Sequence, residues 1–281
     1  MVNAKDALKS LTPPLLWDMA RILWRKARGL AVRTFEGPFS SWEAAVSRSY
    51  GWDSPDLTDK TLNAALKVRD GLIEFEQYLV ASKNIVYSTT ILAFLLLLLS
   101  RDKGNINIID FGGGLGNSYV QNRKILRQLV ATSVRWNIVE RPVFVKLGME
   151  HFQTDELKFY STMDEALSSV APFAEALLFG SSLQYIADPL SLLDQVVNAG
   201  IKIVAMDRTP FWPGSEHAIF IQHLPPVFNG VTLPVWCFSK DRLVAWFVAK
   251  GFTLVERFAP DNDSSFHWCG MIFVKQTGGG A

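Results

Sequence analysis

The stretch Ile108-Ile109-Asp110-Phe111-Gly112-Gly113-Gly114-Leu115-Gly116-Asn117 decides the fold of this chain. It predicts a buried strand that ends in an acid, then a glycine-rich turn, then a helix that starts near Ser118. Glycine adopts a positive φ at little cost, so such a turn leads directly from strand to helix and lets the backbone approach a ligand closely. The amides at the start of the helix then point toward that ligand.

The glycines Gly112, Gly114 and Gly116 follow Asp110 with the spacing Asp-x-Gly-x-Gly-x-Gly. A dinucleotide-binding turn has the spacing Gly-x-Gly-x-x-Gly, and its third glycine would fall at Asn117. The spacing in this chain instead resembles the first motif of the class I S-adenosylmethionine-dependent methyltransferases. The resemblance implies S-adenosyl-L-methionine as the cofactor, with these glycines and Asn117 beside it and Asp110 near its methionine amino group.

The spacing of apolar residues along the sequence changes near residue 100. Up to about Ser100, apolar residues recur mostly at helical spacing, and we expect helices throughout this region. From Asn105 onward, short apolar runs alternate with helical stretches, which predicts an α/β domain. The expected strands are 106–111, 135–140, 157–160, 176–179 and 201–207, followed by an aromatic insert at 209–238, a helix at 239–250 and strands at 252–258 and 271–275.

This order resembles the Rossmann-like, seven-stranded methyltransferase sheet, in which the last strand lies antiparallel between the fifth and the sixth. We therefore expect a helical N-terminal cap region over residues 1–100 and a cofactor-binding domain over residues 101–277, with residues 209–238 as an insert on the substrate side. The apolar run 91–99 is too short to cross a bilayer, which takes about 20 residues. We expect it to form a helix buried under the sheet.

Composition excludes several classes of function. The formal net charge of the 281 residues is +1, which argues against a large nucleic-acid interface. The two cysteines lie far apart in the sequence, and no Cys/His cluster has the spacing of metal ligands, so we expect neither a disulfide framework nor a metal site. The N-terminus lacks the continuous apolar core of a signal peptide, and we expect a cytoplasmic protein.

Candidate site residues stand where the expected strands end, because ligands of open α/β sheets bind outside the carboxyl ends of the strands. Glu140 ends the second strand, where an acid can accept both ribose hydroxyls of a nucleoside. The alternative is a surface glutamate beside Arg141. After the third strand Asp164 comes a few residues late and would equally suit a helix cap, so the adenine contact stays open.

The segment after the fourth strand offers three polar candidates, Ser181, Gln184 and Tyr185, which we expect to face cofactor or substrate. The alternative is that these side chains only make bonds at the start of a helix. We assign Ser181 to the cofactor and Tyr185 to the candidates for catalysis.

The fifth strand ends in Asp207 and Arg208. Asp207 is our first candidate for a base that accepts a proton from a substrate hydroxyl, and Arg208 could hold an anionic group. The alternative is an ion pair between the two that closes the loop. His223, in the aromatic insert, is the second candidate for the base, ahead of Tyr185; the alternative for His223 is packing within the cap.

Five further segments resemble a narrower family, bacterial methyltransferases associated with surface-polysaccharide biosynthesis. The segments are 35–44, 51–55, 117–124, 136–140 and 207–211. The resemblance implies O-methylation of a sugar on a surface-glycan intermediate. Two alternatives stay open, namely a methyltransferase of a soluble small metabolite and a non-catalytic scaffold that partners a glycan-assembly enzyme.

The expected helix at 15–29 has an apolar face and four basic residues against one acid, a net charge of +3. Such a helix either packs its apolar face on the cap or lies in a membrane interface as a peripheral contact. We keep both interpretations.

Overall fold

The computed structural model describes residues 34–51, 55–70, 75–77, 80–82, 87–129, 132–170, 176–224, 230–258 and 266–276. The chain divides into two compact units. The larger unit contains Pro55–Ala218 and Val235–Ala281, and the smaller contains Met1–Ser54 and Ile219–Pro234. These units cut across the regions expected from the sequence. The helix expected at 15–29 lies outside the described residues.

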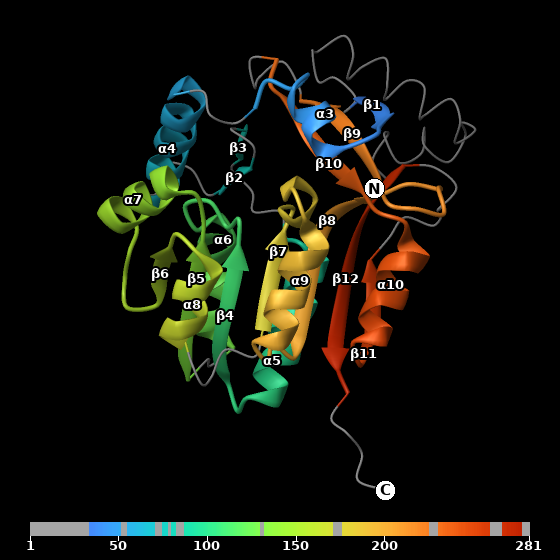
Figure 1. Cartoon of the computed structure of the whole chain (residues 1–281). Coiled ribbons are helices and arrows are strands. Elements are labelled where there is room, and N and C mark those ends of the chain that lie inside the picture. Colours follow the sequence, from blue (N-terminus) through green and yellow to red (C-terminus); the bar gives the residue numbers. More distant parts are fainter. Residues whose placement is uncertain are drawn as a thin grey trace, which may run out of the picture. The chain divides into compact units, whose positions relative to one another are not determined.

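A seven-stranded sheet with the order β11-β12-β8-β7-β4-β5-β6 forms the centre of the larger unit (Figure 1). The strands are β4 (Asn105–Phe111), β5 (Ser133–Val139), β6 (Leu157–Tyr160), β7 (Ala176–Gly180), β8 (Ile203–Phe211), β11 (Phe252–Phe258) and β12 (His267–Lys275). Neighbouring strands from β8 to β6 pair in parallel, and β12 lies antiparallel between β8 and β11. This order confirms the expected methyltransferase-type sheet, although β8 continues to Phe211 instead of ending at Asp207.

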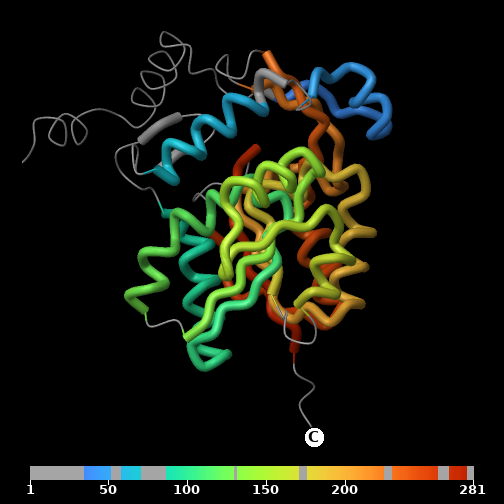
Figure 2. The backbone as a smooth tube through the Cα atoms, turned by 90° about the vertical axis from the view of Figure 1, so that its left-hand side faces the viewer, coloured from blue at the N-terminus to red at the C-terminus, as the bar shows by residue number. Residues whose placement is uncertain are grey.

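Helices cover both faces of this sheet (Figure 2). One core forms between the sheet and α5 (Thr89–Arg101), α6 (Asn117–Gln128) and α7 (Pro142–His151). The other forms between the sheet and α8 (Met163–Val170), α9 (Pro189–Asn198) and α10 (Lys240–Ala249). The central strands are apolar on both faces, as parallel strands between two helical layers must be.

The apolar run 91–99 forms most of α5, whose Ile91, Phe94, Leu95 and Leu98 are buried against the sheet. This confirms the buried helix expected there. Within the described ranges, no helix is both long enough and apolar enough to span a membrane.

The expectation of helix throughout the first 100 residues is wrong at three strands. α4 (Pro55–Arg69) is helical as expected, but β2 (Phe75–Gln77) and β3 (Val80–Ser82) follow it as an antiparallel pair. The third strand is β1 (Thr34–Phe39), in the smaller unit.

The smaller unit is built on a three-stranded sheet with the order β1-β9-β10. β1 pairs antiparallel with β9 (Ala218–His223), and β10 (Thr232–Cys237) completes the sheet; α3 (Trp42–Val46) follows β1. Gly37 lies close to β9, since a Cβ there would approach Phe220 Cδ1 to 2.9 Å. The Gly37-Pro38 pair therefore belongs to a strand, although in sequence it suggests a break.

Candidate functional site

Asp110 lies at the carboxyl edge of the sheet, near the end of β4, and is completely buried. Trp136 Nε1 donates a hydrogen bond to its Oδ2 at 2.9 Å, while Oδ1 has no hydrogen-bond partner in the described part of the chain. Burial raises the pKa of Asp110 to about 7, and the charge of Glu140 adds to this, whereas the Trp136 bond and the charge of Arg208 act against it. A buried oxygen without a partner calls for a donor from outside the chain, which is water or a ligand.

The turn after β4 has the tight geometry that its glycines predict. Gly112 has a φ of +70°, and a Cβ there would lie 2.5 Å from the Cβ of Ser182. A Cβ at Gly113 would lie 2.7 Å from the Asp110 carboxyl carbon. Gly114, with a φ of +60°, differs, because a Cβ placed there would meet no atom within 4 Å. The turn is thus packed on its inner side and open at Gly114.

α6 begins directly after this turn. Gly116 is its N-cap residue, with a φ of +94° and no side-chain cap, and Asn117 is the first residue of the helix. The start of α6 therefore faces the loop with backbone groups, the arrangement that suits a ligand at a helix N-terminus.

Glu140 follows β5, as predicted, and is largely buried, with 15% of its side chain exposed. Its Oε2 accepts a hydrogen bond from the Arg141 backbone N–H at 2.5 Å and lies 3.8 Å from Arg141 Nε. Burial raises the pKa of Glu140, and the Arg141 contacts oppose this. The interaction with Arg141, the alternative left open by the sequence, is therefore present, and it engages Oε2.

The loop after β7 joins the ends of three strands. Ser182 Oγ donates to the Phe111 carbonyl at the end of β4, at 2.5 Å. The Ser181 N–H donates to the Asp207 carbonyl in β8 at 2.8 Å. Ser181, predicted to face the cofactor, has a φ of +69°, which is unusual for a residue other than glycine. Gly112, Ser181 and Asp207 therefore come together at one edge of the sheet.

A short 3-10 helix, Leu183–Tyr185, continues this loop. Gln184 is completely buried, and its Nε2 donates to Ser181 Oγ at 3.0 Å and to the Arg208 carbonyl at 3.4 Å. Tyr185 is half-buried, and its backbone N–H donates to the Ser182 carbonyl.

Asp207 and Arg208 form the ion pair that the sequence left as an alternative. Arg208 Nη1 lies 2.8 Å from Asp207 Oδ2, and the side chains are 32% and 6% exposed. Arg208 also has a positive φ, +49°, inside β8. The bond from the Ser181 N–H to the Asp207 carbonyl places the pair at the same edge of the sheet as the glycine turn.

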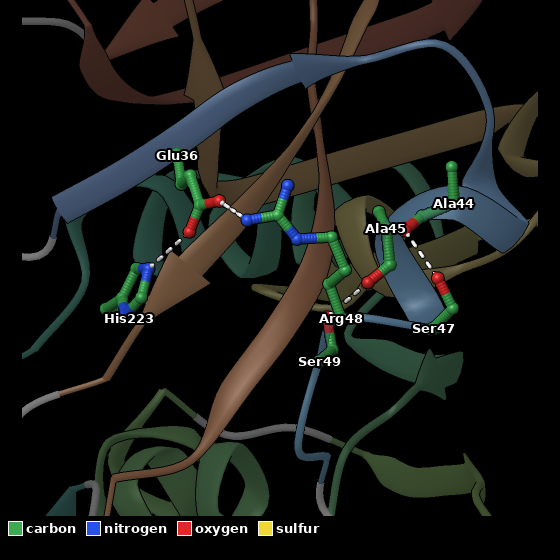
Figure 3. Close-up of polar contacts among 7 residues, drawn as sticks. All are labelled: Glu36, Ala44, Ala45, Ser47, Arg48, Ser49 and His223. Carbon is green, nitrogen blue, oxygen red and sulfur yellow. Dashed lines mark hydrogen bonds and ion pairs between the residues drawn. The ribbon is translucent and has the colours of Figure 1, made fainter.

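His223 lies at the end of β9 in the smaller unit, beside Glu36 of β1 (Figure 3). Its Nε2 is 3.3 Å from Glu36 Oε2, and the other oxygen of Glu36 accepts a bond from Arg48 Nη2 at 2.5 Å. The His223 side chain is 45% exposed. The Glu36 carboxylate thus lies between the His223 ring and the Arg48 guanidinium and contacts both.

Sequence reasoning missed Trp136, Ser182 and Thr209 at this edge. Trp136 has no local signal, because it meets Asp110 only when β5 pairs with β4. Asp164, left open for adenine, lies in the first turn of α8 and accepts from Gln195 Nε2 at 2.8 Å. Over the described residues, no three His, Cys, Asp or Glu side chains are grouped closely enough to hold a metal ion.

No protein-family model matches the chain, and no curated protein matches it in sequence. Among solved structures, the chain is similar to the Burkholderia thailandensis 1,6-didemethyltoxoflavin-N1-methyltransferase with bound S-adenosylhomocysteine, at 14% identity and a TM-score of 0.44 over 88% of this chain and 97% of that one. It is also similar to the magnesium protoporphyrin IX methyltransferase of Synechocystis PCC 6803 with bound SAM, at 10% identity and a TM-score of 0.43 over 84% and 92%. A third neighbour is the N-terminal domain of EvdMO1 with bound SAH, at 16% identity and a TM-score of 0.47 over 76% and 97%. These values describe a distant likeness, and the fold of this chain rests on its own strand order.

Proposed function

We propose that this chain is an S-adenosylmethionine-dependent methyltransferase. The observation that carries the proposal is the glycine turn, which is open at Gly114 and closely packed at Gly112 and Gly113. Two acids flank this turn: Asp110, whose buried Oδ1 has no hydrogen-bond partner among the described residues, and Glu140, which is largely buried. An open turn between two such acids fits a ligand that brings both an amino group and a ribose.

The residues present fit this cofactor. Asp110 would hold the amino group of the methionine part, and Glu140 would accept the two ribose hydroxyls. The backbone of Gly112, Gly114 and Gly116 would line the space between these two acids. Asn117, at the start of α6, and Ser181, in the loop after β7, would lie at the two ends of that space.

The chemistry divides between cofactor and chain. When bound, S-adenosylmethionine supplies an electrophilic methyl group. The chain would align the acceptor oxygen and exclude water, which account for most of the catalysis in such a transfer. Asp207 would accept the proton of the acceptor hydroxyl, and its ion pair with Arg208 would hold the carboxylate in place. His223 and Tyr185 remain the second and third candidates for the base.

The acceptor that we propose is a sugar hydroxyl of a surface-glycan intermediate in the cytoplasm. The resemblance of five sequence segments to methyltransferases associated with surface polysaccharides supports it. A soluble small metabolite is the alternative acceptor. A non-catalytic scaffold is the alternative function, which the intact turn and its two acids disfavour.

A pair of glycine variants tests the cofactor site. Gly114 and Gly251 both have a positive φ, +60° and +81°, and a Cβ at either meets no atom within 4 Å. Alanine at each position would therefore cost a similar amount of stability, about 1–2 kcal/mol for the left-handed backbone. Only Gly114→Ala would fill the space beside the turn and abolish binding of S-adenosylhomocysteine, measured by calorimetry. Gly251→Ala would bind like the unmodified protein.

Two results would contradict the proposal. One is binding of NADH without binding of S-adenosylhomocysteine. The other is equal binding by the Gly114→Ala and Gly251→Ala variants, which would remove the ligand from the turn.

A further inference from the structure

Three polar side chains next to the proposed cofactor site have buried atoms without hydrogen-bond partners among the described residues. They are the Oε1 of Gln184, the Nε of Arg208 and the Oγ1 of Thr209. All three residues stand at the carboxyl edge of β7 and β8. Buried polar groups in folded proteins nearly always have partners, so a group of three such atoms indicates a binding partner from outside the chain.

Gln184 is fixed at the centre of this group. Its amide nitrogen bonds Ser181 Oγ and the Arg208 carbonyl, which links the two residues of this edge that hold a positive φ without being glycine. Turning the amide round would still leave one of its polar atoms without a partner. Backbone strain of this kind persists where a functional geometry requires it, and here two strained positions converge on one side chain.

The charges of the group set the kind of ligand. Arg208 is paired with Asp207 at 2.8 Å, so the guanidinium charge is largely compensated within the chain. An anionic ligand would have to compete with Asp207 for Arg208. The unpartnered atoms comprise a donor, Arg208 Nε, an acceptor, Gln184 Oε1, and a hydroxyl that can act as either, in Thr209. Asp207 Oδ2 also has no hydrogen bond among the described residues, but it is held in the ion pair with Arg208. Such a set of atoms matches an uncharged ligand that both donates and accepts hydrogen bonds.

We propose that Gln184, Arg208 and Thr209 form a subsite for two neighbouring hydroxyl groups of an uncharged sugar ring. Each hydroxyl of such a pair donates one hydrogen bond and accepts others, so the pair satisfies donors and acceptors together. The inference rests on the proposed function, and it adds that the sugar next to the reacting oxygen bears no charge. It replaces the expectation that Arg208 holds an anionic group.

Sugar titrations followed by NMR test this subsite. The probes are a panel of neutral methyl hexopyranosides that present cis and trans neighbouring hydroxyls, together with glucuronate and glucosamine as charged counterparts. They are added to the full chain with and without saturating S-adenosylhomocysteine. We expect at least one neutral sugar to shift the Gln184 side-chain amide and Arg208 Nε–H signals and to bind at least tenfold more tightly than glucuronate. Its counterpart lacking one of the two neighbouring hydroxyls would bind at least tenfold more weakly.

A matched pair of variants separates the subsite from general effects. Gln184→Met keeps the side-chain volume and would weaken sugar binding at least tenfold, measured without S-adenosylhomocysteine. Gln195→Met, which removes an amide on α9 that bonds Asp164, would leave sugar binding unchanged.

The subsite is overturned if no sugar of the panel shifts the two signals, if glucuronate binds more tightly than every neutral sugar, or if Gln184→Met binds the sugar normally. The signals of the unmodified protein decide the question even if the variant does not fold. Failure to bind S-adenosylhomocysteine would overturn the proposed function alone, because the titration without it still reports on the subsite.

Discussion

Asp110 is a carboxyl group in a place that disfavours its charge. Its single protein hydrogen bond comes from Trp136, and burial is the main cause of its raised pKa. Buried titratable groups with strongly shifted pKa values often serve function at the expense of stability. Two measurable consequences follow at the scale of this residue.

The first concerns stability against pH. Asp110 has a pKa of about 7 in the folded protein and about 3.9 when unfolded, so between these values the folded state binds the extra proton. Stability contributed by this group is present at low pH and is lost as pH rises toward 7. Asp110→Asn should therefore melt above the unmodified protein at pH 8, with the difference shrinking toward pH 4. Asp155→Asn, at an exposed acid, should show no such trend. A constant difference across this range would contradict the raised pKa.

The second concerns ligand binding against pH. A cationic amino group favours the ionised form of Asp110, which is the minor form below pH 7. The affinity for S-adenosylhomocysteine should fall as pH decreases below about 7, approaching tenfold per pH unit. Calorimetry in buffers of different ionisation enthalpy should show proton release on binding near pH 6. Absence of proton release would mean that the ligand amino group does not reach this acid.

At the scale of elements, helix α5 packs closely against strand β12. Gly270 lies where the pairing of β12 with β8 shifts register, and a Cβ there would overlap the Oγ1 of Thr90, in the first turn of α5. Thr90 is almost completely buried. The helix therefore packs against the backbone of the inserted strand, which requires glycine at that position.

A double-mutant cycle tests this contact. Gly270→Ala should lower the free energy of unfolding by about 1–3 kcal/mol, the usual cost of overpacking. Thr90→Ala removes the nearest atoms, so the double variant should be more stable than the sum of the two single changes predicts. Denaturant unfolding measures all three, and strict additivity would show that Thr90 is not the obstacle.

Elements were predictable where the chain itself carries the signal. The strand before the glycine turn and the helix at 91–99 have continuous apolar runs, and both form as expected. β1 has no such signal: the sequence Thr34–Phe39 contains Gly-Pro, and its hydrogen-bonding partner β9 is distant in the sequence. The same distinction explains which residues of the candidate site could be predicted. The turn and its acids are local, whereas Trp136 and the positive φ of Ser181 and Arg208 depend on contacts between strands.

At the scale of the whole molecule, the peripheral membrane contact stays a prediction, because residues 15–29 lie outside the described part. Each basic residue of that segment near the surface should contribute about 1 kcal/mol to the binding of anionic vesicles, and salt should screen this attraction. Co-sedimentation with vesicles of anionic lipid should be salt-sensitive for the full chain and should be lost on removal of residues 1–30. The control replaces Arg21, Arg25, Lys26 and Arg28 by Gln, which should also abolish it. Equal sedimentation of full-length and truncated protein would assign the helix to packing.

The smaller unit is assembled from segments that are remote in the chain, and this imposes an order on biosynthesis. Glu36 and His223, which meet in it, are 187 residues apart. At a translation rate of about 5–20 residues per second, β1 would leave the ribosome about 10–40 s before β9 exists. During that time β4, β5, β6 and β7 emerge together with their helices, while β1 waits as an unpaired edge. We therefore expect the nascent chain to benefit from a chaperone that protects β1 until the β1-β9-β10 sheet is complete.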